Sequence, residues 1–135
     1  GNTNDTRESA AIKICKDLLD EGAELLIHDP KVNASQIESD LKISPISIKS
    51  DNSTFNKKEG EGTWDFSNTI EKTFIDADAV LILTEWDEYR KLNWKLIAKK
   101  MVPPAWVFDS KSIVNTEEVK DAGLRLWRLG NGLED

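Results

Sequence analysis

The chain has 135 residues, a length that favours one domain large enough to bury a hydrophobic core without disulfides or metal ions. Its formal net charge of −7 argues against nucleic acids and membrane surfaces as partners, because binding them requires an excess of Lys and Arg. The single cysteine excludes an internal disulfide and fits a reducing compartment. No apolar run approaches the roughly 18 residues that span a bilayer, and no signal sequence opens the chain, so we expect a cytoplasmic protein.

The first expected element is a helix that begins near Asp5, which has Glu8 three residues later in the spacing of a capping box. Apolar residues at helical spacing follow, and Gly22 provides the end signal. Cys15 lies on the apolar face, so we interpret it as a core residue and not as a nucleophile. In a βαβ unit a strand precedes the helix. Either the chain begins with a loop or an upstream strand has been left off.

Residues 24–29 predict the first strand, and the only histidine, His28, lies at its end. Without a second imidazole to share a metal ion, we interpret His28 as a packing or rim residue. Asn33 can cap a short helix that runs to residue 40. Residues 43–49 alternate like a short edge strand.

Residues 50–63 are polar and contain glycines, and they predict a flexible surface loop. Gly60 and Gly62 do not form a phosphate loop, because no strand precedes them and no Lys-Ser or Lys-Thr pair follows. Residues 64–75 have apolar side chains at helical spacing and predict an amphipathic helix.

Residues 79–83 form an unbroken apolar run, which is typical of a central strand covered on both faces. The elements expected after it are a turn at 87–90, a helix at 94–101, a buried strand at 105–108, a helix at 116–122 and an alternating edge strand at 124–129. The alternation of helices and strands predicts an α/β fold. We expect a three-layer, Rossmann-like sandwich with a mostly parallel sheet, which lacks its first strand if the sequence starts after it.

Polar side chains follow two of the expected strands, where open parallel sheets bind their ligands. They are Thr84, Glu85 and Trp86 after the first strand, and Asp109, Ser110 and Lys111 after the second. If the two strands are neighbours, right-handed crossovers bring both loops to one crevice, where the Lys111 ammonium would suit a phosphate. Polar strand ends also occur in Rossmann-like domains without such a site, so a purely structural role stays open.

Several short motifs follow one another along the chain: Asp-Thr-Arg-Glu-Ser at 5–9, Gly-Ala at 22–23, Asp-Pro-Lys-Val at 29–32, the stretch 78–87 with Thr-Glu-Trp-Asp at its end, and Phe-Asp at 108–109. Taken together and in this order, they resemble the carboxyl-terminal UDP-binding domain of the UDP-glucose 6-dehydrogenases. The resemblance covers nearly the whole chain. Within it, Arg7 and Asp29 are interpreted as a structural tie between a loop and a strand end.

The resemblance implies that this chain is part of a longer, NAD-dependent enzyme that oxidises UDP-glucose to UDP-glucuronate in two steps. In that family a separate Rossmann domain binds NAD and a central region carries the catalytic cysteine, while the domain resembled here helps to hold the UDP part of the substrate. Residues 1–135 contain no Gly-x-Gly-x-x-Gly after a strand, and Cys15 does not lie in the family's cysteine motif. We therefore expect this chain alone to be inactive, to bind no NAD or metal and to have no catalytic residue. Its expected partners are a UDP-sugar and the missing NAD-binding and central domains.

The chain departs from the family pattern at two places. The family's first strand would precede Asn2, and its usual Phe-Asp-Gly-Arg is Phe-Asp-Ser-Lys here, so that Ser110 replaces a glycine and Lys111 an arginine. Lysine keeps the charge that reaches the diphosphate but loses the two-pronged guanidinium. Two alternatives therefore stay open: a related UDP-N-acetyl-sugar or GDP-mannose dehydrogenase domain, and a non-catalytic stand-alone binding or assembly module.

Overall fold

The computed structural model of this chain describes residues 4–47, 62–128 and 133–134. The chain divides into two compact units, Gly1–Ile70 and Glu71–Asp135. The expectation of one domain over residues 1–135 stays a prediction, and the expected loop at 50–63 lies outside the described residues apart from its last two.

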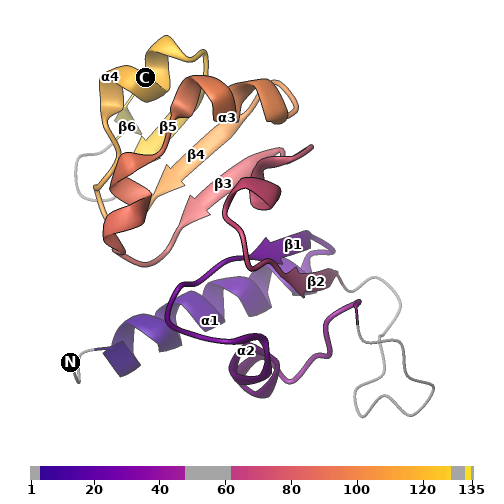
Figure 1. The fold of residues 1–135 in the computed structure, drawn as a ribbon. Helices are drawn as coiled ribbons and strands as arrows, with labels where there is room; N and C mark the ends of the chain where they lie inside the picture. The colour runs from indigo at the N-terminus through magenta and orange to yellow at the C-terminus, as the bar shows by residue number, and fades with distance from the viewer. Residues whose placement is uncertain (1–3, 48–61, 129–132, 135) are drawn as a thin grey trace. The chain divides into compact units, whose positions relative to one another are not determined.

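The first unit is built on a pair of parallel strands with two helices (Figure 1). Its elements are α1 (Asn4–Asp20), β1 (Glu24–Ile27), α2 (Ala34–Leu41) and β2 (Thr63–Phe66). β1 and β2 run in register from Glu24 opposite Thr63 to Ile27 opposite Phe66. The expected helix at the start, the first strand and the helix capped by Asn33 are all present, and the Asn33 side chain accepts a hydrogen bond from the Gln36 amide as expected.

The core of this unit lies between the two helices and β2. Its buried residues are Leu19, Ile37, Leu41 and Trp64. The Trp64 indole Nε1 donates a hydrogen bond of 2.7 Å to the Ile43 carbonyl oxygen, which fixes the chain that leaves α2. A buried indole requires such an acceptor, so this contact sets the path of residues 43–47 beside β2.

Two expectations in this region are wrong. Residues 64–75 do not form one amphipathic helix, because Thr63–Phe66 is strand β2 and Glu71–Phe74 is the short 3-10 helix η1. Pairing with β1 outweighs the helical spacing, and the Ser67 hydroxyl, which donates to the Thr69 carbonyl, turns the chain after the strand. The second is the edge strand at 43–49. Its described part, residues 43–47, is irregular and makes one backbone bond to β2, from the Ile46 amide to the Trp64 carbonyl.

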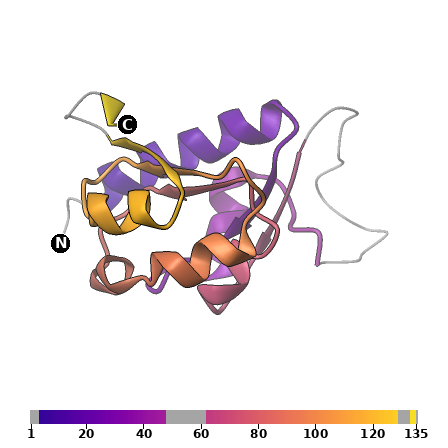
Figure 2. The same ribbon diagram turned by 90° about the horizontal axis from the view of Figure 1, so that it is seen from above.

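The second unit contains a four-stranded sheet in the order β3-β4-β5-β6. After η1 its elements are β3 (Ala79–Ile82), η2 (Asp87–Lys91), α3 (Trp94–Lys100), β4 (Trp106–Asp109), α4 (Thr116–Asp121), β5 (Arg125–Arg128) and β6 (Leu133–Glu134). The first three strands are parallel and β6 is antiparallel to β5. Helices α3 and α4 lie on the same face of this sheet (Figures 1 and 2). An α/β fold with mostly parallel strands is therefore confirmed.

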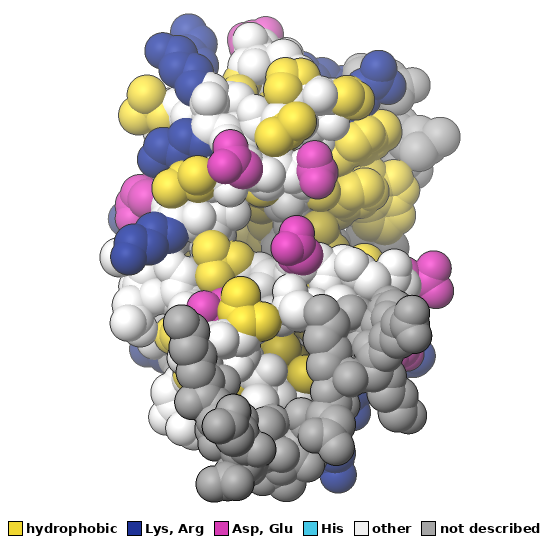
Figure 3. Space-filling view, turned by 90° about the vertical axis from the view of Figure 1, so that its right-hand side faces the viewer, with side chains coloured by type: hydrophobic (Ala, Val, Ile, Leu, Met, Phe, Trp, Pro, Cys, Tyr) yellow, Lys and Arg dark blue, Asp and Glu magenta, His cyan; other side chains and the backbone are white. Residues whose placement is uncertain are grey.

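The strands expected at 79–83, 105–108 and 124–129 are present, but their places in the sheet differ from expectation. β5 lies between β4 and β6 and is not an edge. β3 was expected to be central, yet within the described residues it pairs with β4 alone, and the Leu81 side chain is 37% exposed. Further hydrophobic side chains lie on the surface of the face that Figure 3 draws.

No helix in the described part of the chain is long and apolar enough to cross a membrane.

Candidate functional site

The carboxyl ends of β3 and β4 lie side by side in the parallel sheet. Ile82 is opposite Asp109 in the register of the two strands. The backbone amide of Ser110 donates to the Ile82 carbonyl oxygen at 3.2 Å, and the Ser110 hydroxyl donates to the same oxygen at 2.7 Å. The expectation that these two strands are neighbours is therefore confirmed. The six candidate residues lie at or just after the carboxyl ends of these strands.

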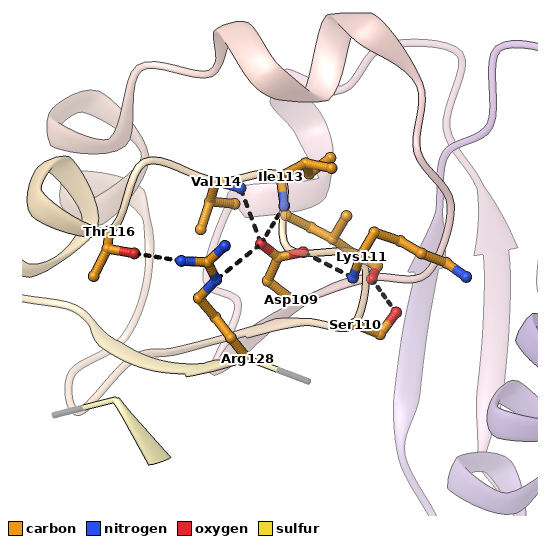
Figure 4. A network of polar contacts seen from close by, with 8 residues as sticks. Asp109, Ser110, Lys111, Ile113, Val114, Thr116 and Arg128 are labelled. Atoms are coloured by element: carbon orange, nitrogen blue, oxygen red, sulfur yellow. Dashed lines mark hydrogen bonds and ion pairs between the residues drawn. The ribbon is translucent and has the colours of Figure 1, made fainter. Parts of the chain in front are cut away.

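The Asp109 carboxylate organises the loop after β4 (Figure 4). Its side chain is fully buried. Oδ1 accepts a hydrogen bond from the Lys111 amide at 3.0 Å, while Oδ2 accepts from the amides of Ile113 at 2.7 Å and Val114 at 2.9 Å. A carboxylate removed from water needs such donors, and these three wrap the chain around it. Within the described structure the Asp109 carboxylate faces its own loop and shapes it.

Arg128, the last residue of β5, reaches the same carboxylate. The Nε atom of Arg128 lies 3.9 Å from Asp109 Oδ2, and its Nη1 donates a hydrogen bond of 2.8 Å to the hydroxyl of Thr116 at the start of α4. The Arg128 side chain is only 16% exposed. Because 3.9 Å is too long for a hydrogen bond, buried Nε has no acceptor among the described residues. The guanidinium thus connects the ends of two strands and one helix.

The Lys111 side chain points away from the Asp109 carboxylate, and its ammonium group extends beyond the network (Figure 4). Its backbone amide is tied to Asp109, but its Nζ makes no hydrogen bond or ion pair with the described residues. The next residue, Ser112, has a φ of 56°, in the left-handed region that non-glycine residues rarely adopt. The loop is therefore held in a tight, specific shape, while the one cation that it presents is available.

The loop after β3 carries the other three candidates. Thr84 and Trp86 are half-buried, whereas Glu85 is exposed. The Trp86 carbonyl oxygen accepts a hydrogen bond from the Tyr89 amide, and η2 begins at the next residue. This short helix therefore fixes the position of Trp86. Thr84 and Glu85 lie between the end of β3 and this helix.

The described residues favour neither a metal site nor a nucleophilic cysteine. No group of three or more His, Cys, Asp or Glu side chains within residues 10–47 and 62–128 could hold a metal ion. Burial raises the pKa of the Cys15 thiol to about 11, which disfavours the thiolate that a nucleophile requires.

The Asp29 carboxylate accepts hydrogen bonds from the amides of Lys31 and Val32, a local turn contact. The side chain of Arg7, its expected partner, lies outside the described residues.

Arg128 and Thr116 were missed by the sequence interpretation. A usable signal was present, because strand alternation places Arg128 on the same face as Leu124 and Leu126, which are both buried. An arginine on a buried face needs an acidic partner. The register of β4 and β5, which sets Asp109 opposite Arg128, is what identifies that partner.

Similarity to known proteins shows which family the chain belongs to. Residues 1–116 match the UDP binding domain of the UDP-glucose/GDP-mannose dehydrogenase family. The chain belongs to this family. It is 35% identical over 140 residues to UDP-glucose 6-dehydrogenase 2 of Arabidopsis thaliana, and 37% identical over 129 residues to the UDP-glucose 6-dehydrogenase of Drosophila melanogaster. The family resemblance found in the sequence is therefore confirmed.

The chain corresponds to a limited part of these family members. The match with the Arabidopsis protein covers 99% of this chain and 28% of that protein, and the match with the Drosophila protein covers 96% and 26%. Among solved structures, an NDP-N-acetyl-D-galactosaminuronic acid dehydrogenase from Methanosarcina mazei aligns with 93% of this chain and 29% of its own, at a TM-score of 0.50 and 15% identity. This likeness supports the α/β fold.

Proposed function

We propose that this chain holds the UDP part of the substrate in a UDP-glucose 6-dehydrogenase. The observation that carries the proposal is the match of nearly the whole chain, at about 35% identity, to proteins with that name. Lys111 is the residue that meets the diphosphate, with Asp109 and Ser110 shaping its loop. Thr84, Glu85 and Trp86 border the ligand from the end of β3.

Three features of the loop after β4 support this assignment. It starts at the carboxyl end of a parallel strand, where open α/β sheets bind nucleotides. The Lys111 ammonium has no acidic partner among the described residues, so its charge is not neutralised within this part of the chain. Ser110 replaces a glycine of the family pattern, and its hydroxyl donates a hydrogen bond to the Ile82 carbonyl oxygen. The side chain therefore stabilises the loop through a bond to β3.

Calorimetric titration with UDP tests this site. We expect wild type to bind UDP and Lys111→Ala to bind it 10- to 100-fold more weakly, since a hydrogen bond to a charged group contributes roughly 1.5–3 kcal/mol. Raising the salt concentration should weaken binding to wild type more than binding to the variant. Lys95→Ala, which removes an exposed lysine of α3, is the matched control and should bind as wild type does. Equal affinity of wild type and Lys111→Ala would refute the role of Lys111.

The complete enzyme requires parts that these 135 residues do not supply. We place the chain at the carboxyl-terminal end of a longer cytoplasmic protein, whose other domains bind NAD and carry the catalytic cysteine. Its 28% share of the Arabidopsis protein supports this view. The complete protein should reduce NAD when given UDP-glucose, whereas the isolated chain should not. A reading frame without an upstream glycine-rich NAD loop and cysteine motif would contradict the assignment.

The family resemblance implies a further strand directly before α1, as a βαβ connection to β1 requires. Extending the natural reading frame upstream should therefore raise the midpoint of urea unfolding, and an unchanged midpoint would count against it.

Replacement of Gly-Arg by Ser110 and Lys111 motivates a second candidate, a stand-alone binding or assembly module with the family fold. A natural reading frame that starts close to Asn2, combined with no measurable UDP binding, would favour this candidate over the enzyme. Related dehydrogenases of UDP-N-acetyl sugars or GDP-mannose are a nearer alternative. Competition among UDP, GDP and their sugars for the chain distinguishes them.

A further inference from the structure

We infer that Arg128 is a positioning residue for the nucleotide site, acting through Asp109 on the loop that carries Lys111. This inference rests on the proposed role of Lys111. Arg128 acts without contacting the ligand. It holds Asp109 from the β5 side, and Asp109 in turn holds the backbone of the loop.

Burying the Asp109 carboxylate has an energetic cost that its neighbours must offset. Its carboxylate is 0% exposed, and moving a charge out of water is unfavourable unless charged or polar partners replace the water. Three backbone amides supply hydrogen bonds, but they bring no full charge. Among the described residues, the cation beside this carboxylate is the guanidinium of Arg128, whose Nε lies 3.9 Å from Oδ2. Without it, burial of Asp109 loses its charge compensation.

The Asp109 carboxylate holds the backbone of the loop after β4 in place. The Lys111 amide donates to Oδ1, and the amides of Ile113 and Val114 donate to Oδ2, so both oxygens bind the loop. Between these residues Ser112 has its unfavourable φ of 56°. A strained residue persists only when its surroundings fix it. If Asp109 shifts or takes up water, the loop relaxes and the Lys111 side chain starts from a different backbone position.

Arg128 is itself anchored by regular structure. Its Nη1 binds the hydroxyl of Thr116, and Thr116 is the first residue of α4, which is capped by the Asn115 side chain through the Glu118 amide. The register of β5 sets Arg128 opposite Asp109. The arginine is thus tied to two regular elements, β5 and α4, while the loop that it supports is irregular. This arrangement transmits the rigidity of the fold to the loop.

The inference can be tested by a double-mutant cycle on UDP affinity with Arg128→Gln and Lys111→Ala. In the wild-type background we expect Arg128→Gln to weaken UDP binding by roughly 5- to 30-fold, within the range found for coupled neighbours. In the Lys111→Ala background the same change should have little effect, because the residue that Arg128 positions is gone. An equal loss in both backgrounds would overturn the inference, since Arg128 would then act independently of Lys111.

Controls separate positioning from general destabilisation. Arg125→Gln changes the other arginine of β5, which lies over the Trp106 ring, and should leave UDP affinity unchanged. Arg128→Lys, which keeps the charge, should restore part of the affinity lost in Arg128→Gln. If Arg128→Gln does not fold, Thr116→Val removes only the hydroxyl acceptor and should weaken binding by a smaller factor. Wild-type affinity in both Thr116→Val and Arg128→Gln would overturn the inference.

Hydrogen exchange gives a readout that needs no ligand. The amides of Ile113 and Val114 should exchange roughly tenfold faster in Arg128→Gln, while amides of the first unit keep their rates, because opening is local to the loop. Unchanged exchange at these two amides would overturn the role of Arg128. Faster exchange combined with no UDP binding by wild type would leave the support of the loop intact but refute the proposed nucleotide site.

Discussion

At the residue scale, the fully buried Asp109 carboxylate makes the largest difference between what the sequence indicates and what the structure assigns. The sequence placed Asp109 among residues at a ligand crevice. In the structure its oxygens are occupied by amides of residues 111–114. Residue type and position predicted that Asp109 lies at the end of a buried strand, as it does in β4. They did not predict its hydrogen bonds, because the closing of the loop depends on Arg128, which lies 19 residues later in the chain.

We expect Asp109→Asn to lower the free energy of unfolding by roughly 3–5 kcal/mol, the usual effect of breaking a buried charge pair. An amide in this position offers one acceptor oxygen where two are needed. Urea unfolding measures the change. Asp87→Asn is the control, since that carboxylate is 96% exposed in its pair with Arg90 and should change stability by less than about 0.5 kcal/mol. A similar loss in both variants would show that the Asp109 network has no special role.

The Cys15 thiol supplies a test by pH. Burial raises its pKa from 9.0 to about 11, so below pH 9 the folded protein should contain about a hundredfold less thiolate than the unfolded chain. Alkylation at pH 8 should be slower in native protein than in denaturant by at least that factor. The protonated thiol's contribution to stability is complete below pH 9 and is lost as the pH rises through 11, relative to Cys15→Ala. Equal labelling rates in native and unfolded protein would contradict the burial of Cys15.

At the element scale, strong local signals predicted helices and strands well. Asn33 capped its helix as expected, and the apolar runs at 79–83 and 105–108 became strands. The error at 64–75 has a clear origin, because Trp64 and Phe66 fit a strand period while Ile70 and Phe74 fit a helical period that includes Phe66. Pairing with β1, a contact between residues about 40 positions apart, decided between them. The sequence alone could not supply that contact.

Gly62 shows how such a contact constrains one position. Its amide donates to the Leu19 carbonyl oxygen at 2.7 Å, and a Cβ atom added at this residue would lie against the backbone carbonyl of Ala23. We therefore expect Gly62→Ala to destabilise the first unit by roughly 1–3 kcal/mol, the usual cost of overpacking, as measured by urea unfolding. Thr63→Ser, which keeps the same backbone, is the control. Wild-type stability of Gly62→Ala would mean that β2 does not start as described.

At the scale of the whole molecule, the match to UDP-glucose 6-dehydrogenases assigns a family, and the sheet brings together the two strand ends at which we propose the site. The loops after β3 and β4 both follow the carboxyl ends of neighbouring parallel strands. Of these two loops, only the second carries a lysine without an acidic partner among the described residues. The order of motifs in the sequence predicted this family, as the match over residues 1–116 confirms. The support that Arg128 gives to the loop was not predictable, because it needs the register of β4 and β5.

The most direct test of the account is an NMR titration of the chain with UDP that follows every backbone amide. We predict the largest shift changes at residues 84–86 and 109–111, with phosphate-dependent changes at Lys111 that weaken when uridine replaces UDP. Lys111→Ala should retain its fold but lose most of these changes. Shifts concentrated in the first unit, or shifts of equal size with uridine and UDP, would contradict a diphosphate site at the ends of β3 and β4.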